Sequence, residues 1–259
     1  AAVVNGDTKP SVSDFFVTGA SYIYQTTQFP DSSTKYHNYY LLLRVGAYFG
    51  ACSHVPEQLG VDAAGELSGK ALKSCLTDPR LPVRIAAMDA YFGTVYPHER
   101  QCSEAVELPG GTPTEKAEFR DNLIADIAKV EQGMKIALIG VVNPLIAAIR
   151  KRGGTCLPCD LQMERTHWGD PVEKDMEKVL DSADGVICTG MTLSNGTFDR
   201  VIERVLERSI PLTVYAQTGS AVAARFVGAG ITSLVAEPFP FSQFSANATR
   251  VFCYRGQGD

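Results

Sequence analysis

The sequence lacks the long apolar runs of a membrane protein and the positive charge of a nucleic-acid-binding protein. None of its segments approaches the roughly 18 consecutive apolar residues that a helix needs to cross a bilayer. The net charge is −5, and the longest basic cluster, Arg150-Lys151-Arg152, falls near an expected helix end, where the helix dipole favours cations. A nucleic-acid-binding surface would need a larger basic stripe. We therefore expect neither a membrane nor a nucleic acid as a partner.

Disulfide spacing and the common catalytic motifs are missing as well. The seven cysteines are odd in number and scattered along the chain, which predicts reduced thiols and a cytoplasmic location. The sequence contains no GxSxG elbow, no P-loop and no HExxH motif. No motif of this kind therefore names a reaction, and whether the protein is an enzyme stays open.

The first part of the sequence has the character of a small α+β domain. Segments 15–28 and 39–52 are rich in Tyr, Phe, Val and Thr, which predicts two strands. The polar residues 30–34 between them predict a hairpin loop. Segment 66–76 predicts a short helix, and apolar residues at helical spacing predict a longer one over 81–96. We place this domain over residues 1–110.

The second part follows a Pro- and Gly-rich linker at residues 109–113. A helix is expected from 114 to about 132, and strands then alternate with helices. This alternation predicts a doubly wound parallel sheet with right-handed crossovers, and thus a Rossmann-like α/β domain over residues 114–259. The expected strands are 135–140, 155–161, 185–189, 211–216 and 231–235, with helices at 144–152, 172–181, 197–208 and 219–227. The tail after Pro238 is expected to pack back on one domain.

Small and polar residues gather where these strands are expected to end. In doubly wound sheets the ligand crevice lies at the carboxyl ends of the strands. An acidic residue at the end of the second strand typically accepts hydrogen bonds from a ribose, and Asp160 stands there. The loop from 189 to 197 has more hydroxyl and amide groups than helix capping needs. We expect ten residues to bind a small ligand: Gly140, Asn143, Asp160, Thr189, Gly190, Thr192, Asn195, Thr197, Gln217 and Thr218.

Candidate metal ligands and acid–base groups are fewer than the candidate ligand-binding residues. Cys156 and Cys159 form a CxxC pair, but residues i and i+3 of a strand point to opposite faces, so the two thiols should diverge. Cys159 alone, beside Asp160, could still face the crevice. His167 is predicted on a loop over the crevice, where it is either an exposed histidine or a functional group. The candidate metal ligands are Asp160, His167 and Cys159, and the candidate catalytic residues are His167 and Asp89.

Several stretches resemble a family of uncharacterised proteins named for heavy-metal chelation. They are IALIGVVNP, Asp160 with Gly169-Asp170-Pro171, ADGVICTGMTLSNGTFDRVIE and VYAQTGSAVAARFVGAGITSLVAEP, with LSGKALKSCL and LPVRIAAMDAYFG in the first part. The resemblance implies a small enolase-N-terminal-like domain followed by a Rossmann-like domain, and loosely implies metal handling. The sequence departs from the family pattern at Asp89-Ala90, where Asn-Ala is usual, and at Gln217-Thr218-Gly219.

Three functions remain open. In the first, the protein binds a metal ion or a metal chelate between its two domains. In the second, it is a biosynthetic enzyme acting on a small polar or nucleotide-derived molecule such as S-adenosylmethionine. The cofactor stays open between a divalent metal and S-adenosylmethionine or another nucleotide. In the third, it is a non-catalytic scaffold or sensor. A homodimer is expected from the aromatic character of the first part.

Overall fold

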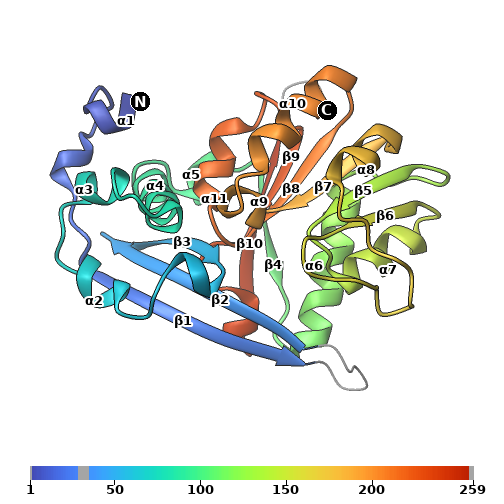
Figure 1. The fold of residues 1–259 in the computed structure, drawn as a ribbon, viewed down its shortest axis with the longest axis horizontal. Coiled ribbons are helices and arrows are strands. Elements are labelled where there is room, and N and C mark those ends of the chain that lie inside the picture. Colours follow the sequence, from blue (N-terminus) through green and yellow to red (C-terminus); the bar gives the residue numbers. More distant parts are fainter. Residues whose placement is uncertain (1, 29–34, 257–259) are drawn as a thin grey trace.

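The computed structural model describes residues 2–28 and 35–256, and two sheets organise it (Figure 1). The hairpin loop expected at residues 30–34 lies outside the described residues. The sequence prediction of an α/β protein is confirmed, with a small antiparallel sheet preceding a larger, mostly parallel one. No helix among the described residues combines the length and the apolarity that crossing a membrane requires.

The first sheet has three antiparallel strands in the order β1-β2-β3, which are β1 (Gly19–Gln28), β2 (Lys35–Val45) and β3 (Tyr48–His54). The single strand expected over 39–52 is wrong, because a turn at Gly46, with φ +58, divides it into β2 and β3. Helix α4 (Leu81–Val95) packs on this sheet as the sequence predicts. The contact is close at Gly50, where an added Cβ would lie 2.1 Å from the backbone nitrogen of Ala90.

The helix expected over 66–76 is also divided. Helix α2 (Ala63–Leu67) ends before Gly69, which has φ +84, and helix α3 (Leu72–Leu76) begins after it. The amide of Gly69 donates a hydrogen bond to the Val17 carbonyl at 2.8 Å, so a tertiary contact replaces the helical bond. The remaining short helices of this part are α1 (Ala2–Asn5), η1 (Val12–Asp14), η2 (Pro56–Gln58) and α5 (His98–Gln101).

The second sheet has seven strands in the order β4-β10-β9-β8-β7-β5-β6. The five strands predicted from the sequence form its parallel part: β5 (Lys135–Ile139), β6 (Thr155–Cys159), β7 (Gly185–Thr189), β8 (Leu212–Ala216) and β9 (Ser233–Ala236). Two antiparallel strands were not predicted. They are β4 (Glu104–Leu108), which comes from the segment assigned to the first domain, and β10 (Thr249–Arg255), which is part of the tail.

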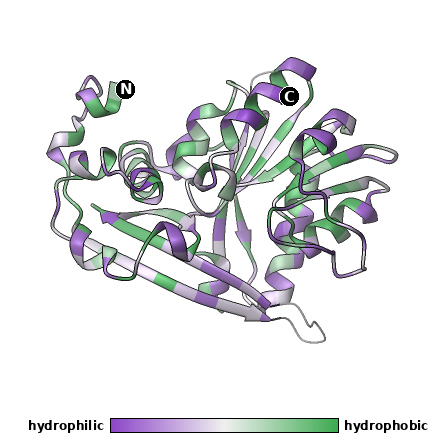
Figure 2. Ribbon diagram, in the orientation of Figure 1, coloured by the Kyte–Doolittle hydropathy of each residue, from purple (hydrophilic) through white to green (hydrophobic). Residues whose placement is uncertain are grey.

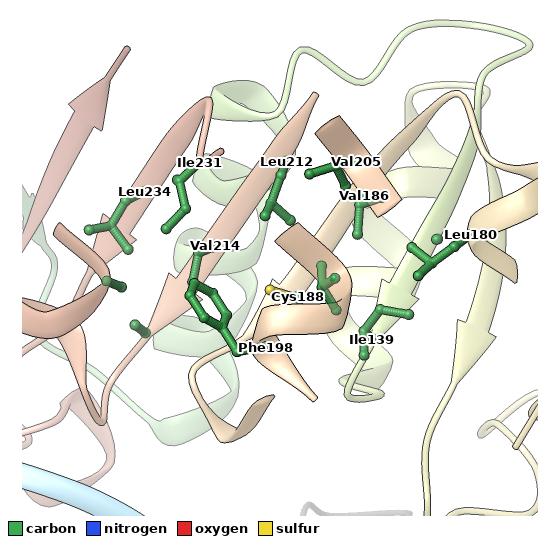
Figure 3. Close-up of a cluster of buried hydrophobic side chains, with 14 of the residues drawn as sticks. Ile139, Leu180, Val186, Cys188, Phe198, Val205, Leu212, Val214, Ile231 and Leu234 are labelled. Atoms are coloured by element: carbon green, nitrogen blue, oxygen red, sulfur yellow. The ribbon is translucent and has the colours of Figure 1, made fainter. Parts of the chain in front are cut away.

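Helices cover both faces of this sheet, as the doubly wound prediction requires. Helices α6 (Pro113–Ile127) and α7 (Asn143–Lys151) pack together, and α8 (Met176–Ser182) contacts α10 (Phe198–Arg208). Figure 3 shows the core beneath α10, where Phe198 and Val205 meet side chains of β7 and β8 such as Val186 and Val214. Figure 2 shows that α10 mixes hydrophobic and hydrophilic residues, consistent with one buried and one exposed side.

Three predicted helices differ in extent. Residues expected in a helix at 172–175 belong to a long loop, because the side chain of Asp175 accepts the amide of Glu177 and so starts α8. The helix expected at 219–227 is shortened to α11 (Ser220–Ala223), followed by η3 (Ala224–Phe226). The helix expected to reach residue 132 ends at Ile127. The polar loop at 189–197 contains a short helix, α9 (Met191–Ser194).

The first sheet and α4 adjoin the carboxyl ends of the parallel strands. The Gly219 amide, after β8, donates to the Ala51 carbonyl of β3 at 2.9 Å. Apolar contacts continue the interface, since Tyr40 of β2 packs on Phe241 near η4 (Ser242–Phe244) and Phe49 packs on Phe239. The fold therefore brings β2 and β3 to the edge of the second sheet where ligand sites of doubly wound folds occur.

Candidate functional site

The strand order reverses beside β5, which defines the switch point of the sheet. The chain leaves β5, forms β6 on one side, and returns to form β7 on the other side. Gly140 follows β5 with φ +88, and an added Cβ there would lie 2.5 Å from Thr189 Oγ1 at the end of β7. Thr189 is 9% exposed, and its Oγ1 has no hydrogen-bond partner among the described residues. Two predicted ligand residues therefore meet where doubly wound proteins bind ligands.

Asn143 joins three segments at this switch point. Its Nδ2 donates to the Tyr36 hydroxyl of β2 at 2.7 Å, and its Oδ1 accepts the backbone amide of His167 at 3.0 Å. Burial raises the pKa of Tyr36, although the Asn143 hydrogen bond opposes this shift. Asn143 thus connects the first sheet, the start of α7 and the loop after β6.

Asp160 organises the turn after β6. Its Oδ2 accepts the Val141 amide at 3.0 Å, and its Oδ1 accepts the amides of Gln162 and Met163 at 2.8 and 3.0 Å. Both oxygens therefore hold backbone, and they bring the turns after β5 and β6 together. Binding of a ribose or a metal by Asp160 stays a prediction.

The His167 imidazole is exposed and does not take part in the Asn143 contact, which uses the backbone amide. The ring lies edge-on to Trp168, with centroids 5.5 Å apart. Trp168 in turn lies over the guanidinium of Arg150, at 4.9 Å. The loop is therefore attached to α7 at two points, through Asn143 and Arg150.

The cysteines of the CxxC pair pack on opposite sides of the second sheet. Cys159 belongs to the cluster beneath α10, whereas Cys156 packs against the cluster beneath α6 and α7. The expected divergence of the two thiols is confirmed. Burial raises the pKa of Cys156 to about 12 and that of Cys159 to about 11, which disfavours the thiolate form that metals require.

A bare metal ion fits poorly in the described part of the chain. No group of three or more His, Cys, Asp or Glu side chains among residues 2–28 and 35–256 is placed to hold one. Asp160, His167 and Cys159 do not form such a group. Structural metal sites commonly use four protein ligands and catalytic zinc sites three.

The loop after β7 uses most of its polar groups locally. Thr192 is buried and donates to the Thr189 carbonyl at 2.8 Å. Asn195 Oδ1 accepts both the amide and the hydroxyl of Thr197, at 3.1 and 2.7 Å, in an exposed turn. Gly190 allows close packing, since an added Cβ would lie 2.4 Å from the Thr218 carbonyl oxygen. Of the five predicted residues in this loop, Thr189 has the one hydroxyl without a described partner.

Gln217 belongs to a buried polar cluster after β8 and β9. Its Nε2 donates to Glu237 Oε2 at 3.0 Å and to Gln243 Oε1 at 2.7 Å. The Tyr215 hydroxyl also donates to Glu237 Oε2, at 2.6 Å. Glu237 is fully buried. The sequence prediction missed it, although an acidic residue directly after an apolar strand is the same signal that identified Asp160.

Helix α6 adds a buried ion pair that the sequence prediction also missed. Arg120 Nε donates to Asp121 Oδ1 at 2.8 Å, and the guanidinium lies over the Tyr215 ring at 4.9 Å. Asp121 is 1% exposed, and burial raises its pKa against the opposing effect of Arg120. Charged residues on a helix usually face solvent, so only their burial marks them as unusual.

Asp89, the other candidate catalytic residue, lies inside the interface between α4, β3 and α11. Its oxygens accept the amides of Ala51 and Ala221 at 2.8 and 2.7 Å. The side chain is 1% exposed, and burial raises its pKa to about 7 against those backbone hydrogen bonds. Its contacts are those of a residue that holds the two parts together, and a catalytic role stays a prediction.

Comparison with known proteins agrees with this fold. Residues 122–232 match the model of the DUF364 family, whose description is "Putative heavy-metal chelation". A protein with unknown function of that family from Desulfitobacterium hafniense DCB-2 has a similar structure, with a TM-score of 0.60, 17% identity, and coverage of 91% of this chain and 82% of that chain. A second, from Pyrococcus horikoshii, has a TM-score of 0.56, 14% identity, and coverage of 92% and 94%.

The resemblance expected from the sequence is confirmed by these matches. At such low identities the two structures show a shared fold. The family description is limited to heavy-metal chelation and names neither a ligand nor a reaction. No curated protein matches the sequence.

Proposed function

We propose that the protein binds a metal in chelated form, held by a small polar organic molecule, at the carboxyl edge of the second sheet beside the first sheet. The observation that supports this most directly is the Thr189 hydroxyl, which is buried against Gly140 without a described partner. A buried hydroxyl without a partner costs about 1–3 kcal/mol. A polar ligand at the switch point would offset that cost.

The donor set favours a chelate over a bare ion. Bare metal ions need several His, Cys, Asp or Glu side chains at one point, and the described residues contain no such group. Hydroxyl, amide and guanidinium groups, such as those of Thr189, Asn143 and Arg120, instead suit the oxygen and nitrogen atoms of an organic molecule. The organic part would then supply the metal ligands, and the protein would recognise the organic part.

The test compares free ions with preformed complexes. Calorimetric titrations use Ni²⁺, Co²⁺ and Zn²⁺, first as free ions and then as their citrate and nitrilotriacetate complexes. We expect at least one complex to bind and the free ions to bind weakly. Failure of all complexes to bind, or tighter binding of the free ions, would contradict the proposal.

Two isosteric variants test the location. Thr189→Val removes the hydroxyl with little change of volume, and we expect it to weaken the complex about tenfold, which corresponds to roughly 1.4 kcal/mol. Thr77→Val removes a hydroxyl that donates to the nearby Ser74 carbonyl on an exposed part of the first domain, and it should leave the affinity unchanged. Equal affinities for both variants would place the ligand elsewhere.

A further inference from the structure

The Arg120–Asp121 pair is buried but incompletely hydrogen-bonded. The two side chains are 11% and 1% exposed. One hydrogen bond joins them, from Arg120 Nε to Asp121 Oδ1. Asp121 Oδ2 has no hydrogen-bond partner among the described residues. The two Nη atoms of Arg120 donate no hydrogen bond to any residue that the structure describes. One carboxylate oxygen and the outer guanidinium nitrogens therefore remain available.

The surroundings of the pair are linked to the first sheet. Burial raises the pKa of Tyr40 to about 12, against the hydrogen bond that its hydroxyl accepts from Gln243 Nε2 at 3.3 Å. The charge of Glu237 raises this pKa further, and that of Arg120 lowers it. The charge of Asp121 similarly contributes to the raised pKa of Tyr36, after the effects of burial and of Asn143. Tyr36 and Tyr40 are separated by four residues on β2, so they lie on one face of the sheet. Hydrogen bonds through Glu237, Gln217 and Gln243 connect the hydroxyl of Tyr215, on whose ring Arg120 lies, to the Tyr40 hydroxyl on that face of β2.

A second buried atom without a described partner belongs to a side chain on the face of the first sheet that carries Tyr36 and Tyr40. Gln25 of β1 stands opposite Asn38 of β2, and Asn38 lies between Tyr36 and Tyr40 in the alternation of the strand. Directly opposed residues of antiparallel strands share a face. Gln25 Oε1 is buried and has no described hydrogen-bond partner. Gln25 therefore adds a buried polar atom without a described partner to the face of the first sheet that carries Tyr36 and Tyr40.

The buried charges around Arg120 and Asp121 indicate which kind of ligand suits this region. Glu237 is already satisfied, because it accepts hydrogen bonds from Tyr215, Gln217 and the Ser242 amide. Lys116, four residues before Arg120 on α6, is buried beside it, and its Nζ donates to the Ser242 carbonyl at 3.5 Å. The two cations Arg120 and Lys116 therefore balance the two anions Asp121 and Glu237. A dianion such as phosphate would upset this balance and lie against the Asp121 carboxylate, whereas a group with both charges would keep the balance and satisfy Arg120 and Asp121 together. A guanidinium with two free nitrogens suits a planar carboxylate.

We propose that Arg120 and Asp121 bind the amino-carboxylate group of an amino acid or an amino-acid-derived chelator. The carboxylate accepts hydrogen bonds from the Arg120 Nη atoms, and the ammonium donates to Asp121 Oδ2. This inference rests on the proposed function and names the class of chelator, since the remaining groups of such a molecule would hold the metal. The Tyr215 ring beneath the guanidinium fixes the plane in which the carboxylate binds.

The experiment uses the twenty L-amino acids without metal as probes. Thermal-shift measurements on the full chain screen them, and calorimetry then compares the best binder with its des-amino acid, its decarboxylated amine and inorganic phosphate. We expect the intact amino acid to bind at least tenfold more tightly than either truncated form and than phosphate. Absence of binding by all twenty, or equal binding of the des-amino acid or of phosphate, would overturn the inference.

Two variants test which charged group of the amino acid Asp121 and Arg120 each bind. Asp121→Asn keeps the shape and removes the charge, so it should reduce the preference for the amino acid over its des-amino form. Arg120→Lys keeps the charge but loses the paired donors. It should therefore weaken the binding of the amino acid and of its des-amino form at least tenfold. Arg152→Lys, at the end of α7 and in an ion pair with Asp126 of α6, is the matched control and should leave both affinities unchanged. Equal affinities for Asp121→Asn and the unmodified protein would also overturn the inference.

These results separate the two proposals. If preformed metal complexes bind and Thr189→Val weakens them while amino acids do not bind, the proposed function stands and the assignment to Arg120 and Asp121 fails. If amino acids bind through Arg120 and Asp121 but no metal complex binds, the assignment stands and the proposed metal-chelate function fails.

Discussion

Asp89 and Ala221 are 132 residues apart in the sequence, and a hydrogen bond of 2.7 Å joins the carboxylate of one to the backbone amide of the other. The second oxygen of Asp89 accepts the amide of Ala51. One side chain of α4 therefore holds β3 and the start of α11 together. Because the loop before α11 follows β8, this contact helps to set the position of the first sheet at the carboxyl edge of the second.

Asp89 should make the stability of the protein depend on pH. Burial raises its pKa from 3.8 to about 7 in the folded state. Between these values the folded carboxyl retains a proton that the unfolded chain has lost, so the free energy of unfolding should fall as pH rises, by about 1.4 kcal/mol per pH unit. Chemical denaturation of the protein and of Asp89→Asn between pH 4 and 8 measures this. The variant should gain stability relative to the unmodified protein up to about pH 7, and parallel curves would contradict the prediction.

Gly50 should be intolerant of any side chain. A Cβ there would lie 2.1 Å from Ala90 N and 2.2 Å from Ala86 O, which are backbone atoms of α4 and cannot move without displacing the helix. We expect Gly50→Ala to destabilise the fold by about 3 kcal/mol, at the upper end for overpacking. Gly65→Ala is the control, because a Cβ at that helical position meets nothing within 4 Å. Thermal denaturation should show a large loss for the first variant alone.

Gly140 should be required for its contact with Thr189 as well as for its backbone conformation. Gly140 and Gly133 have φ values of +88 and +86, but a Cβ on Gly133 meets nothing within 4 Å. Both alanine variants should therefore lose about 1 kcal/mol to backbone strain, and only Gly140→Ala should lose more through the Thr189 contact. Denaturation of the double variant with Thr189→Ala should recover that additional loss. Strictly additive effects would show that the contact is unimportant.

The loop bearing His167 should detach from α7 when Asn143 is changed. Trp168 is the single tryptophan of the chain, so its fluorescence reports on this loop directly. Asn143→Ala removes the acceptor of the His167 amide and should shift the emission of Trp168 and increase its quenching by iodide. Asn195→Ala, whose partner is the adjacent Thr197, should leave the fluorescence unchanged. An unchanged spectrum for Asn143→Ala would mean that the Arg150 contact alone holds the loop.

The sequence predicted the central part of the fold because that part is determined locally. Five apolar strands separated by helical segments leave few alternatives to a parallel sheet, and β5 to β9 confirm it. The antiparallel strands β4 and β10 were missed, because pairing with distant segments stabilises them: β4 pairs with β10, and β10 pairs with β9 as well. The turn at Gly46 was missed for a related reason, since apolar residues continue on both sides of it.

Local sequence also determined where polar groups of the candidate site are found. Gly140 and Thr189 follow apolar strands, and parallel strands bring such ends to one edge. The opposite packing of Cys156 and Cys159 likewise followed from the two-residue repeat of a strand. What only the tertiary structure decided is which polar groups remain available. Backbone amides occupy the carboxylates of Asp160 and Asp89, and those of Val141, Ala51 and Ala221 come from other segments. Packing instead buries Thr189 and Asp121 with hydrogen-bonding atoms that lack described partners. The physical reason is that contacts between distant segments set burial and hydrogen bonding.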